Sequence, residues 1–358
     1  METLLIRILL IGPLPPPMGG ATRHFLTLYR DLEKHPGYRV SLINTSRQQE
    51  FTNPIRNAVV ALRVILDIWK YLRRIDIVSY HASERGMYMF APLVVVLCKV
   101  ARKPVILRVF GGSFGDYYLR KGMLARFIIR RFILSANVVL LQTKRSIQML
   151  QEHATGRLEW FSTYVTMKNH EAKQKISSHD IEDSCHRFVF LGHLWKAKGI
   201  ETMLGAAPAL PENTSIDIFG PLDEYSADEI NVRGLGRVRY CGFLTHSEVE
   251  AKLQDYHCLI LPTYHRSEGY PGVIAEALTQ GIPVITTNWL AIPEIVDQTC
   301  GILIEPNDTA ALVGAVTAMN ADRDWWIRLR RGALARATIF DHKRWARKFE
   351  SICADLAG

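Results

Sequence analysis

The chain has 358 residues, 48% hydrophobic and 22% charged, a composition typical of a globular protein long enough for two domains. Its six cysteines are scattered without a Cys-x-x-Cys pair, which predicts free thiols in a reducing compartment and argues against a disulfide scaffold or a zinc site. The net charge of +9 comes from residues 1–165, which carry 24 Lys and Arg against 10 Asp and Glu. This excess would attract anionic lipid headgroups or an acidic acceptor; nucleic acid is the weaker alternative, because no binding motif accompanies the charge.

Apolar strand-like runs alternate with helix-like stretches in the first half. The run at 4–11 is too short for a signal peptide and predicts a buried first strand, and 93–98 predicts a buried helix rather than a membrane span. This alternation is typical of a parallel sheet covered on both faces, which predicts an α/β, Rossmann-like domain over residues 1–165. The other expected strands lie at 40–43, 75–80, 105–109 and 138–142, and the expected helices at 23–34, 54–73, 86–102, 122–135 and 144–153.

Two glycine-containing turns follow strands in this half. Gly19 and Gly20 lie between the first strand and the first helix, where glycines let a ligand approach the backbone, although a plain turn is the alternative reading. Residues 108–114, Arg-Val-Phe-Gly-Gly-Ser-Phe, stand at a strand end, where open α/β sheets place ligands.

Basic amphipathic stretches occur at 54–73 and 122–135, with arginines interleaved among large apolar residues. Such helices can lie at a membrane surface. The alternative is an ordinary domain helix with one core face and one solvated basic face. The charge of the whole half favours membrane contact.

The second half begins after a polar linker expected at 166–186, and a second Rossmann-like domain is expected over 187–337, followed by a terminal helix at 338–358. A strand ending at Gly192 is followed by Lys198, which directly precedes Gly199 and the expected start of a helix. This arrangement sets a cation beside a phosphate group. The Asp-x-Asp at 322–324 lies between helices and predicts helix capping, so no metal site is expected. Further strands are expected at 216–219, 238–244, 258–262, 283–286 and 301–304, and helices at 308–319 and 322–337.

The most informative stretch is 266–278, Arg-Ser-Glu-Gly-Tyr-Pro-Gly-Val-Ile-Ala-Glu-Ala-Leu, between two strand-like runs. A helix beginning near Pro271 would present free backbone N–H groups and its positive dipole end to an anion such as a diphosphate. Glu268 lies just before this helix and Glu276 lies within it. Their carboxylates would accept hydrogen bonds from sugar and ribose hydroxyls.

These segments, in this order, resemble the retaining glycosyltransferases of family 4, the glycosyl transferases group 1, of the bacterial surface-polysaccharide type. The resemblance implies the GT-B architecture: two Rossmann-like domains whose parallel sheets face each other across a cleft. The C-terminal domain would bind the nucleotide sugar and the N-terminal domain the acceptor, with the terminal helix packing back on the N-terminal domain.

The resemblance also implies residue roles. Glu268 would contact the transferred sugar, Glu276 the ribose, and Lys198 and His193 the diphosphate, so that Glu268, Lys198 and His193 form the catalytic set. Two departures stand out: His193 replaces an arginine, and Phe110 stands where many members have a histidine. The donor-binding candidates are Gly19, Gly20, Gly269, Tyr270, Pro271, Gly272 and Glu276, and the acceptor-side candidates are His81, Phe110, Gly111, Gly112, Ser113 and Asp116.

The expected reaction transfers a glycosyl group from a UDP- or GDP-sugar to an acceptor hydroxyl with retention, with no further cofactor or metal. The acceptor would be lipid-linked or a polysaccharide, and the protein cytoplasmic and peripheral at the inner face of an anionic membrane. Two alternatives remain open, a weakly active nucleotide-sugar-binding partner subunit and a sugar-nucleotide epimerase. An NAD enzyme is disfavoured because no Gly-x-Gly-x-x-Gly follows the first strand.

Overall fold

The computed structural model describes residues 5–16, 19–46, 66–167 and 185–358. They form two compact units, an N-terminal unit of residues 1–162 with 343–358 and a C-terminal unit of residues 163–342. Most of the expected linker at 166–186, and the larger part of the helix expected at 54–73, lie outside the described residues. Residues 66–72 of that stretch are helical.

The N-terminal unit is built on a six-stranded sheet of order β2-β1-β3-β4-β5-β6, in which all neighbouring strands are parallel. Side chains along β1 and β4 are buried on both faces of the sheet, which is why these strands read as continuous apolar runs. The sequence did not predict β6. The strands are β1 Ile6–Gly12, β2 Tyr38–Asn44, β3 Ile77–Ser83, β4 Val105–Phe110, β5 Val138–Leu141 and β6 Arg157–Trp160.

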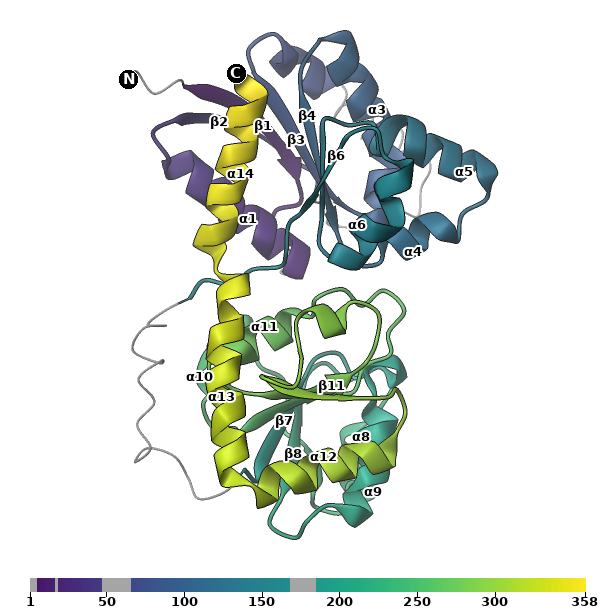
Figure 1. Ribbon diagram of the computed structural model, residues 1–358, viewed down its shortest axis with the longest axis vertical. Helices are drawn as coiled ribbons and strands as arrows, with labels where there is room; N and C mark the ends of the chain where they lie inside the picture. The colour runs from purple at the N-terminus through teal and green to yellow at the C-terminus, as the bar shows by residue number, and fades with distance from the viewer. Residues whose placement is uncertain (1–4, 17–18, 47–65, 168–184) are drawn as a thin grey trace. The chain divides into compact units, whose positions relative to one another are not determined.

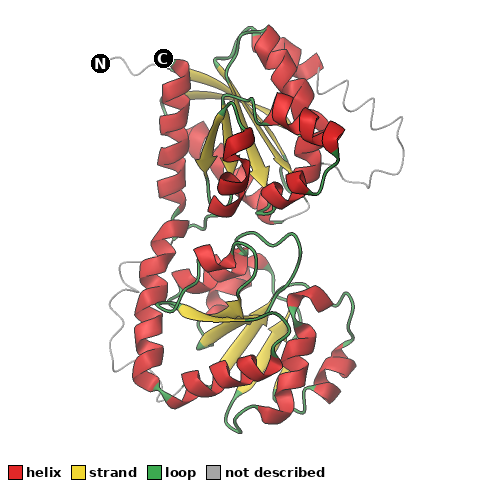
Figure 2. Ribbon diagram, turned by 45° about the vertical axis from the view of Figure 1, so that its right-hand side comes forward, coloured by secondary structure: helices red, strands yellow, loops and turns green. Residues whose placement is uncertain are grey.

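Helices cover both faces of this sheet (Figures 1 and 2). The expected helix at 122–135 is wrong in detail, because α-helical geometry ends at Ile128 and a five-residue π-helical turn, η1 Ile129–Ile133, follows. Ile129 and Ile133 of that turn are fully buried, so the turn forms part of the core. The helices are α1 Gly20–Lys34, α3 Glu84–Val100, α4 Phe114–Leu119, α5 Met123–Ile128 and α6 Lys144–Leu150, with a 3-10 turn, η2, at Gln151–His153.

The terminal helix, α14 His342–Ala357, packs on this same unit (Figure 1). Trp345 is buried and meets the Trp160 ring edge-on at 5.0 Å between ring centroids. The Lys348 ammonium lies 2.7 Å from the Glu159 carboxylate. Edge strand β6 therefore has α14 as a neighbour, which explains how so polar a strand is held.

The C-terminal unit repeats the architecture with a second all-parallel, six-stranded sheet of order β12-β11-β10-β7-β8-β9. Both predicted Rossmann-like sheets are thus confirmed. The strand expected at 238–244 is shorter than predicted. The strands are β7 Arg187–Leu191, β8 Ser215–Phe219, β9 Val238–Tyr240, β10 Cys258–Leu261, β11 Val284–Thr287 and β12 Gly301–Ile304.

Helices flank this sheet as well (Figure 2). Asp322 caps α13 by accepting a hydrogen bond from the Trp325 backbone N–H at 2.8 Å, which confirms the capping reading of the Asp-x-Asp. The helices are α8 Ile200–Ala206, α9 Ala227–Arg233, α10 His246–Leu253, α11 Gly272–Thr279, α12 Thr309–Ala321 and α13 Arg323–Ala337. The 3-10 turns are η4 Lys196–Lys198, η5 Ala207–Ala209, η6 Ile292–Glu294 and η7 Thr338–Phe340.

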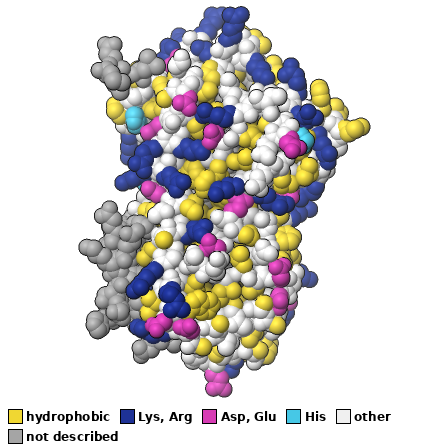
Figure 3. Space-filling model, in the orientation of Figure 1, with side chains coloured by type: hydrophobic (Ala, Val, Ile, Leu, Met, Phe, Trp, Pro, Cys, Tyr) yellow, Lys and Arg dark blue, Asp and Glu magenta, His cyan; other side chains and the backbone are white. Residues whose placement is uncertain are grey.

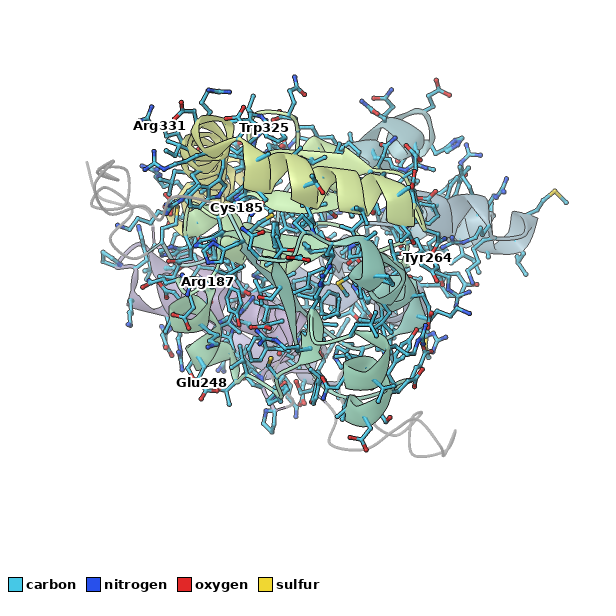
Figure 4. The ribbon with its side chains drawn as sticks, turned by 90° about the horizontal axis from the view of Figure 1, so that it is seen from below. Cys185, Arg187, Glu248, Tyr264, Trp325 and Arg331 are labelled. Carbon is cyan, nitrogen blue, oxygen red and sulfur yellow. The ribbon has the colours of Figure 1, made fainter. Side chains whose placement is uncertain are left out.

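The cysteines are free thiols in the structure, and all but Cys241 are buried. Burial raises the pKa of the Cys98 thiol to about 12. Cys185, labelled in Figure 4, is the first residue of the described range 185–358, and its carbonyl accepts from the Asn320 side chain at 3.0 Å. Within the described ranges, no helix has the length and apolarity needed to span a bilayer, and no three His, Cys, Asp or Glu side chains are grouped as metal ligands.

Candidate active site

The candidate site of the C-terminal unit lies where the order of its strands reverses. Strands β7 and β10 are neighbours in the sheet, with β8 and β9 beyond β7 and β11 and β12 beyond β10. In open parallel sheets, ligands bind outside the carboxyl ends of the strands at this reversal. The loops that leave β7 and β10 here carry Lys198 and Glu268, two of the expected catalytic residues.

These two loops are held against each other. Gly199 has φ +84°, and a Cβ added there would lie 2.2 Å from the Pro262 carbonyl oxygen, so only glycine fits. The Ala197 carbonyl accepts from the Tyr264 backbone N–H at 2.8 Å; Tyr264 is labelled in Figure 4. The backbone on either side of Lys198 is therefore fixed relative to β10.

Lys198 and Glu268 form a nearly buried ion pair, with Nζ 2.6 Å from Oε2 and side chains 15% and 10% exposed. The Thr263 hydroxyl donates to the same carboxylate oxygen at 2.8 Å. Because both hydrogen bonds end on Oε2, Oε1 is the oxygen that can accept from a sugar hydroxyl. The ammonium of Lys198 carries three donors, so it can keep Glu268 and still bind a phosphate oxygen.

His193 was expected beside Lys198 at the diphosphate, and the structure gives it a different ionic partner. Its Nδ1 lies 2.9 Å from Oδ2 of Asp223, and its ring stacks on Trp195 at 4.7 Å between centroids. The Trp195 ring in turn lies 5.6 Å from that of His265. Ring contacts through Trp195 thus link the half-exposed His193 side chain to His265 on the loop after β10.

Asp223 and His265 are site residues that the sequence analysis missed. Both follow strands that end at the same edge of the sheet, β8 and β10, and this position is the signal that could have found them. Burial first, and then the nearby Lys198 ammonium, lower the pKa of His265, so the imidazole is neutral at pH 7. A neutral imidazole adds no positive charge beside the Lys198 ammonium.

Helix α11 begins at Gly272 with Pro271 as its N-cap, one residue later than expected. Gly269 and Tyr270 are buried, and the Tyr270 hydroxyl donates to the Glu294 carboxylate, which ties the loop to η6. Proline has no side-chain acceptor, so the first N–H groups of α11 lack a side-chain cap and can face an anion.

Glu276 lies in the second turn of α11, with a side chain 17% exposed. Its Oε1 is 3.5 Å from Nδ1 of His246, the first residue of α10. The structure therefore places the two glutamates in different settings, Glu268 with a lysine and Glu276 with a histidine. These different partners favour different roles for the two carboxylates.

In the N-terminal unit the strand order reverses between β1 and β3. Gly19 is the N-cap of α1, and its backbone N–H donates to the Thr22 hydroxyl at 2.9 Å. Both Gly19 and Gly20 are exposed, and a Cβ on Gly20 would meet no atom within 4 Å. The glycine at 20 is thus not required by packing among the described residues, which leaves room for a ligand at the backbone.

The loop after β4 is firmly held. Gly111 has φ +105°, and the Gly112 carbonyl accepts from the hydroxyls of Thr143 at 2.9 Å and Ser146 at 2.8 Å. The buried Ser113 donates to the Glu84 carboxylate at 2.6 Å, and burial raises the pKa of Glu84. Glu84, in the first turn of α3, is a further residue that the sequence analysis missed.

The remaining acceptor-side candidates are less open than expected. Asp116 forms an ion pair with Arg145 at 3.1 Å. Phe110 is half-buried with the Arg108 guanidinium 5.0 Å from its ring centroid. Each of these side chains is therefore already engaged within the unit.

His81 requires a correction, because it has no exposed surface. Its Nε2 lies 2.8 Å from the Ser79 hydroxyl, and the rings of Phe25 and Phe110 lie 5.0 and 6.1 Å away. Burial, and then Arg108, hold the pKa of His81 well below its ordinary value, so the ring is neutral. In this conformation an acceptor cannot reach the ring, and we assign His81 to the core.

The comparison with known sequences bears mainly on the C-terminal unit. Residues 185–322 match the family model described as glycosyl transferases group 1. The chain is also 26% identical over 145 residues to the O-antigen chain mannosyltransferase B of Escherichia coli, covering 38% of this chain and 37% of that relative. The chain thus spans well under two thirds of the length of this relative.

Solved structures resemble the whole chain. Anabaena Alr3699/HepE in complex with UDP matches with a TM-score of 0.72 at 14% identity, covering 98% of this chain and all of that one (100%). The apo form of the lipopolysaccharide outer core galactosyltransferase WaaB matches with a TM-score of 0.71 at 14% identity, covering 96% and 98%. The chain therefore has the GT-B fold of these glycosyltransferases, and its residues 185–322 match the glycosyl transferases group 1 in sequence.

Proposed function

We propose that this protein is a retaining glycosyltransferase that moves a sugar from a nucleotide-sugar donor to an acceptor hydroxyl. The observation that carries the proposal is the Lys198–Glu268 pair, which lies at the strand reversal of the C-terminal unit, just before the uncapped start of α11. A lysine ammonium and helix N–H groups suit a diphosphate, and a buried carboxylate with one accepting oxygen suits a sugar hydroxyl.

The proposed residue roles follow from where negative charge develops during the reaction. As the bond between the anomeric carbon and the diphosphate oxygen breaks, negative charge grows on the diphosphate, and the Lys198 ammonium and the N–H groups of α11 stabilise it. The acceptor oxygen forms the new bond on the same face of the sugar, which retains the configuration. Its proton passes to an oxygen of the departing diphosphate, so that the donor supplies its own base.

The proposal also specifies the nucleobase of the sugar donor and the class of acceptor. The HepE structure contains UDP, which favours a uridine nucleotide over the guanosine alternative. The relatives named for O-antigen and lipopolysaccharide sugars favour a bacterial surface polysaccharide or a lipid-linked acceptor. We place the protein at the inner face of the cytoplasmic membrane, where such acceptors would be reached through its basic N-terminal unit.

The two glutamates should separate kinetically. Glu276→Ala is expected to weaken donor binding about tenfold, because a hydrogen bond between a charged carboxylate and a ribose hydroxyl is lost. Glu268→Ala is expected mainly to lower kcat, because Oε1 of Glu268 is proposed to accept a hydrogen bond from the sugar being transferred. Donor titration and initial rates on both variants measure this, with the exposed Glu212→Ala as the matched control. Unchanged affinity in Glu276→Ala together with unchanged kcat in Glu268→Ala would remove the assignment.

A second candidate, a nucleotide-sugar-binding subunit with little activity of its own, is favoured by two observations. His193, which stands where the family pattern has an arginine, lies 2.9 Å from Asp223, and Phe110 carries no polar group. Turnover separates the two readings: the isolated protein should form a glycosylated product from donor and acceptor if the first is right. Nucleotide binding without product would favour the second.

A further inference from the structure

One short helix of the N-terminal unit presents large apolar side chains to solvent. Met123, Leu124 and Phe127 of α5 are 89%, 75% and 61% exposed. The same segment continues into η1, where Ile129 and Ile133 are fully buried, so it is anchored to the unit. Figure 3 shows apolar side chains protruding at the tip over α5, with basic side chains close by. An exposed apolar cluster on an anchored element indicates an interaction surface.

The charge around this tip is of one sign. Residues 117–151 contain seven Lys and Arg and no Asp or Glu. Arg126, Arg130 and Arg131 line a groove of about 750 Å³ together with Met123 and Phe127, and none of the residues that line it is acidic. Guanidinium groups beside apolar side chains match a phosphate that is attached to hydrocarbon.

We propose that α5 and this groove dock onto an anionic phospholipid bilayer. Met123, Leu124 and Phe127 enter the headgroup region, while the arginines of the groove contact lipid phosphates. This deepens the proposed function, on which it rests for the presence of a membrane-borne acceptor. A second copy of the chain is a poorer occupant, because it would bring the three arginines of the groove against the same three arginines. A protein partner could also use Met, Phe and Arg, which are enriched in the cores of protein interfaces, so the vesicle experiment below decides between the two.

Flotation with vesicles of phosphatidylcholine, with and without phosphatidylglycerol, tests the proposal on the full-length protein at low salt. The wild type should float with the phosphatidylglycerol vesicles and be released by salt. Leu124→Ser with Phe127→Ser should weaken this partitioning about tenfold or more, because both side chains leave the headgroup region. Arg130→Gln with Arg131→Gln should weaken it about fivefold for each charge removed.

Matched controls come from exposed positions of the C-terminal unit. Val232→Ser with Leu235→Ser removes the same kind of exposed apolar side chain, and Arg328→Gln with Arg331→Gln removes the same charge. Both controls should float like the wild type. Wild-type protein that does not float at low salt, or α5 variants that float as well as their controls, would overturn the proposal.

Donor binding is measured on the same proteins without vesicles, by the thermal shift that a UDP-sugar produces. The α5 variants should keep the wild-type shift, which shows that they are folded and that their loss concerns the membrane alone. Failure to float with the shift intact would reject the docking surface and leave the proposed transferase standing. Loss of the shift in the wild type would instead count against the proposed function.

Discussion

Lys198→Ala is expected to lower kcat/KM about 100- to 1000-fold, the range found when one preorganised donor to a developing charge is removed. Lys198 supplies a nearly buried positive charge, with Nζ 2.6 Å from Oε2 of Glu268. Steady-state kinetics with the donor varied measure the effect. Lys196→Ala, on the same 3-10 turn but exposed, is the matched control and should keep nearly full activity.

The same substitution should also destabilise the fold, and a second variant separates the two effects. Removing Lys198 leaves the nearly buried Glu268 carboxylate without its partner, which costs about 3–5 kcal/mol. Lys198→Met with Glu268→Gln removes both charges at similar volume and should recover most of that stability. Its activity should stay low. If the double variant recovered activity together with stability, the pair would be structural and the catalytic role of Lys198 would be wrong.

Gly199→Ala is expected to destabilise the C-terminal unit at the loop that carries Lys198. Its φ of +84° costs an alanine about 1–2 kcal/mol, and the new Cβ would lie 2.2 Å from a backbone oxygen of Pro262. A backbone contact cannot rotate away, so we expect a total loss of about 2–5 kcal/mol in the free energy of unfolding. Urea unfolding measures the stability, and donor titration should show that binding weakens too, because Lys198 is adjacent.

Gly236→Ala is the control for this prediction. Gly236 has φ +75°, yet a Cβ added there would meet nothing within 4 Å. The control therefore carries the backbone strain without the close approach and should lose only about 1–2 kcal/mol. Equal losses in the two variants would contradict the tight contact between the loops that leave β7 and β10.

The sheets could be predicted from sequence because their strands are apolar on both faces and alternate with helices, a local pattern. Strand β6 could not, since Arg157-Leu158-Glu159-Trp160 is mixed in polarity and is held by Trp345 and Lys348 of α14. Those partners lie far along the chain, and a local window contains no sign of them. The start of α11 was expected near Pro271 and lies at Gly272, because proline suits both the N-cap and the first helical position.

The site residues divide in the same way, into those predicted from a local motif and those whose contacts join distant parts of the chain. Glu268, Lys198 and Glu276 could be proposed as site residues from sequence, because each stands in a local motif and the motifs follow the order of a known family. The ion pair between Lys198 and Glu268 joins residues 70 positions apart, and it exists because β7 and β10 become neighbours at the strand reversal. His193 was assigned by its place in the motif, but its geometry depends on Asp223, 30 residues away on another loop. His81 was expected to follow a strand, but it lies inside β3, and three aromatic rings bury it.

The most direct test of the central claim, that the C-terminal unit binds a nucleotide sugar at this strand reversal, is a thermal-shift panel. UDP-, GDP-, ADP- and dTDP-sugars are added to the wild type and to Lys198→Ala, since a ligand that binds only the folded state raises the unfolding temperature. We predict that one of these nucleotide sugars, first of all the UDP-sugar, raises the unfolding temperature of the wild type. Lys198→Ala should lose most of this rise. No shift with any nucleotide sugar, or an equal shift in the variant, would contradict the account.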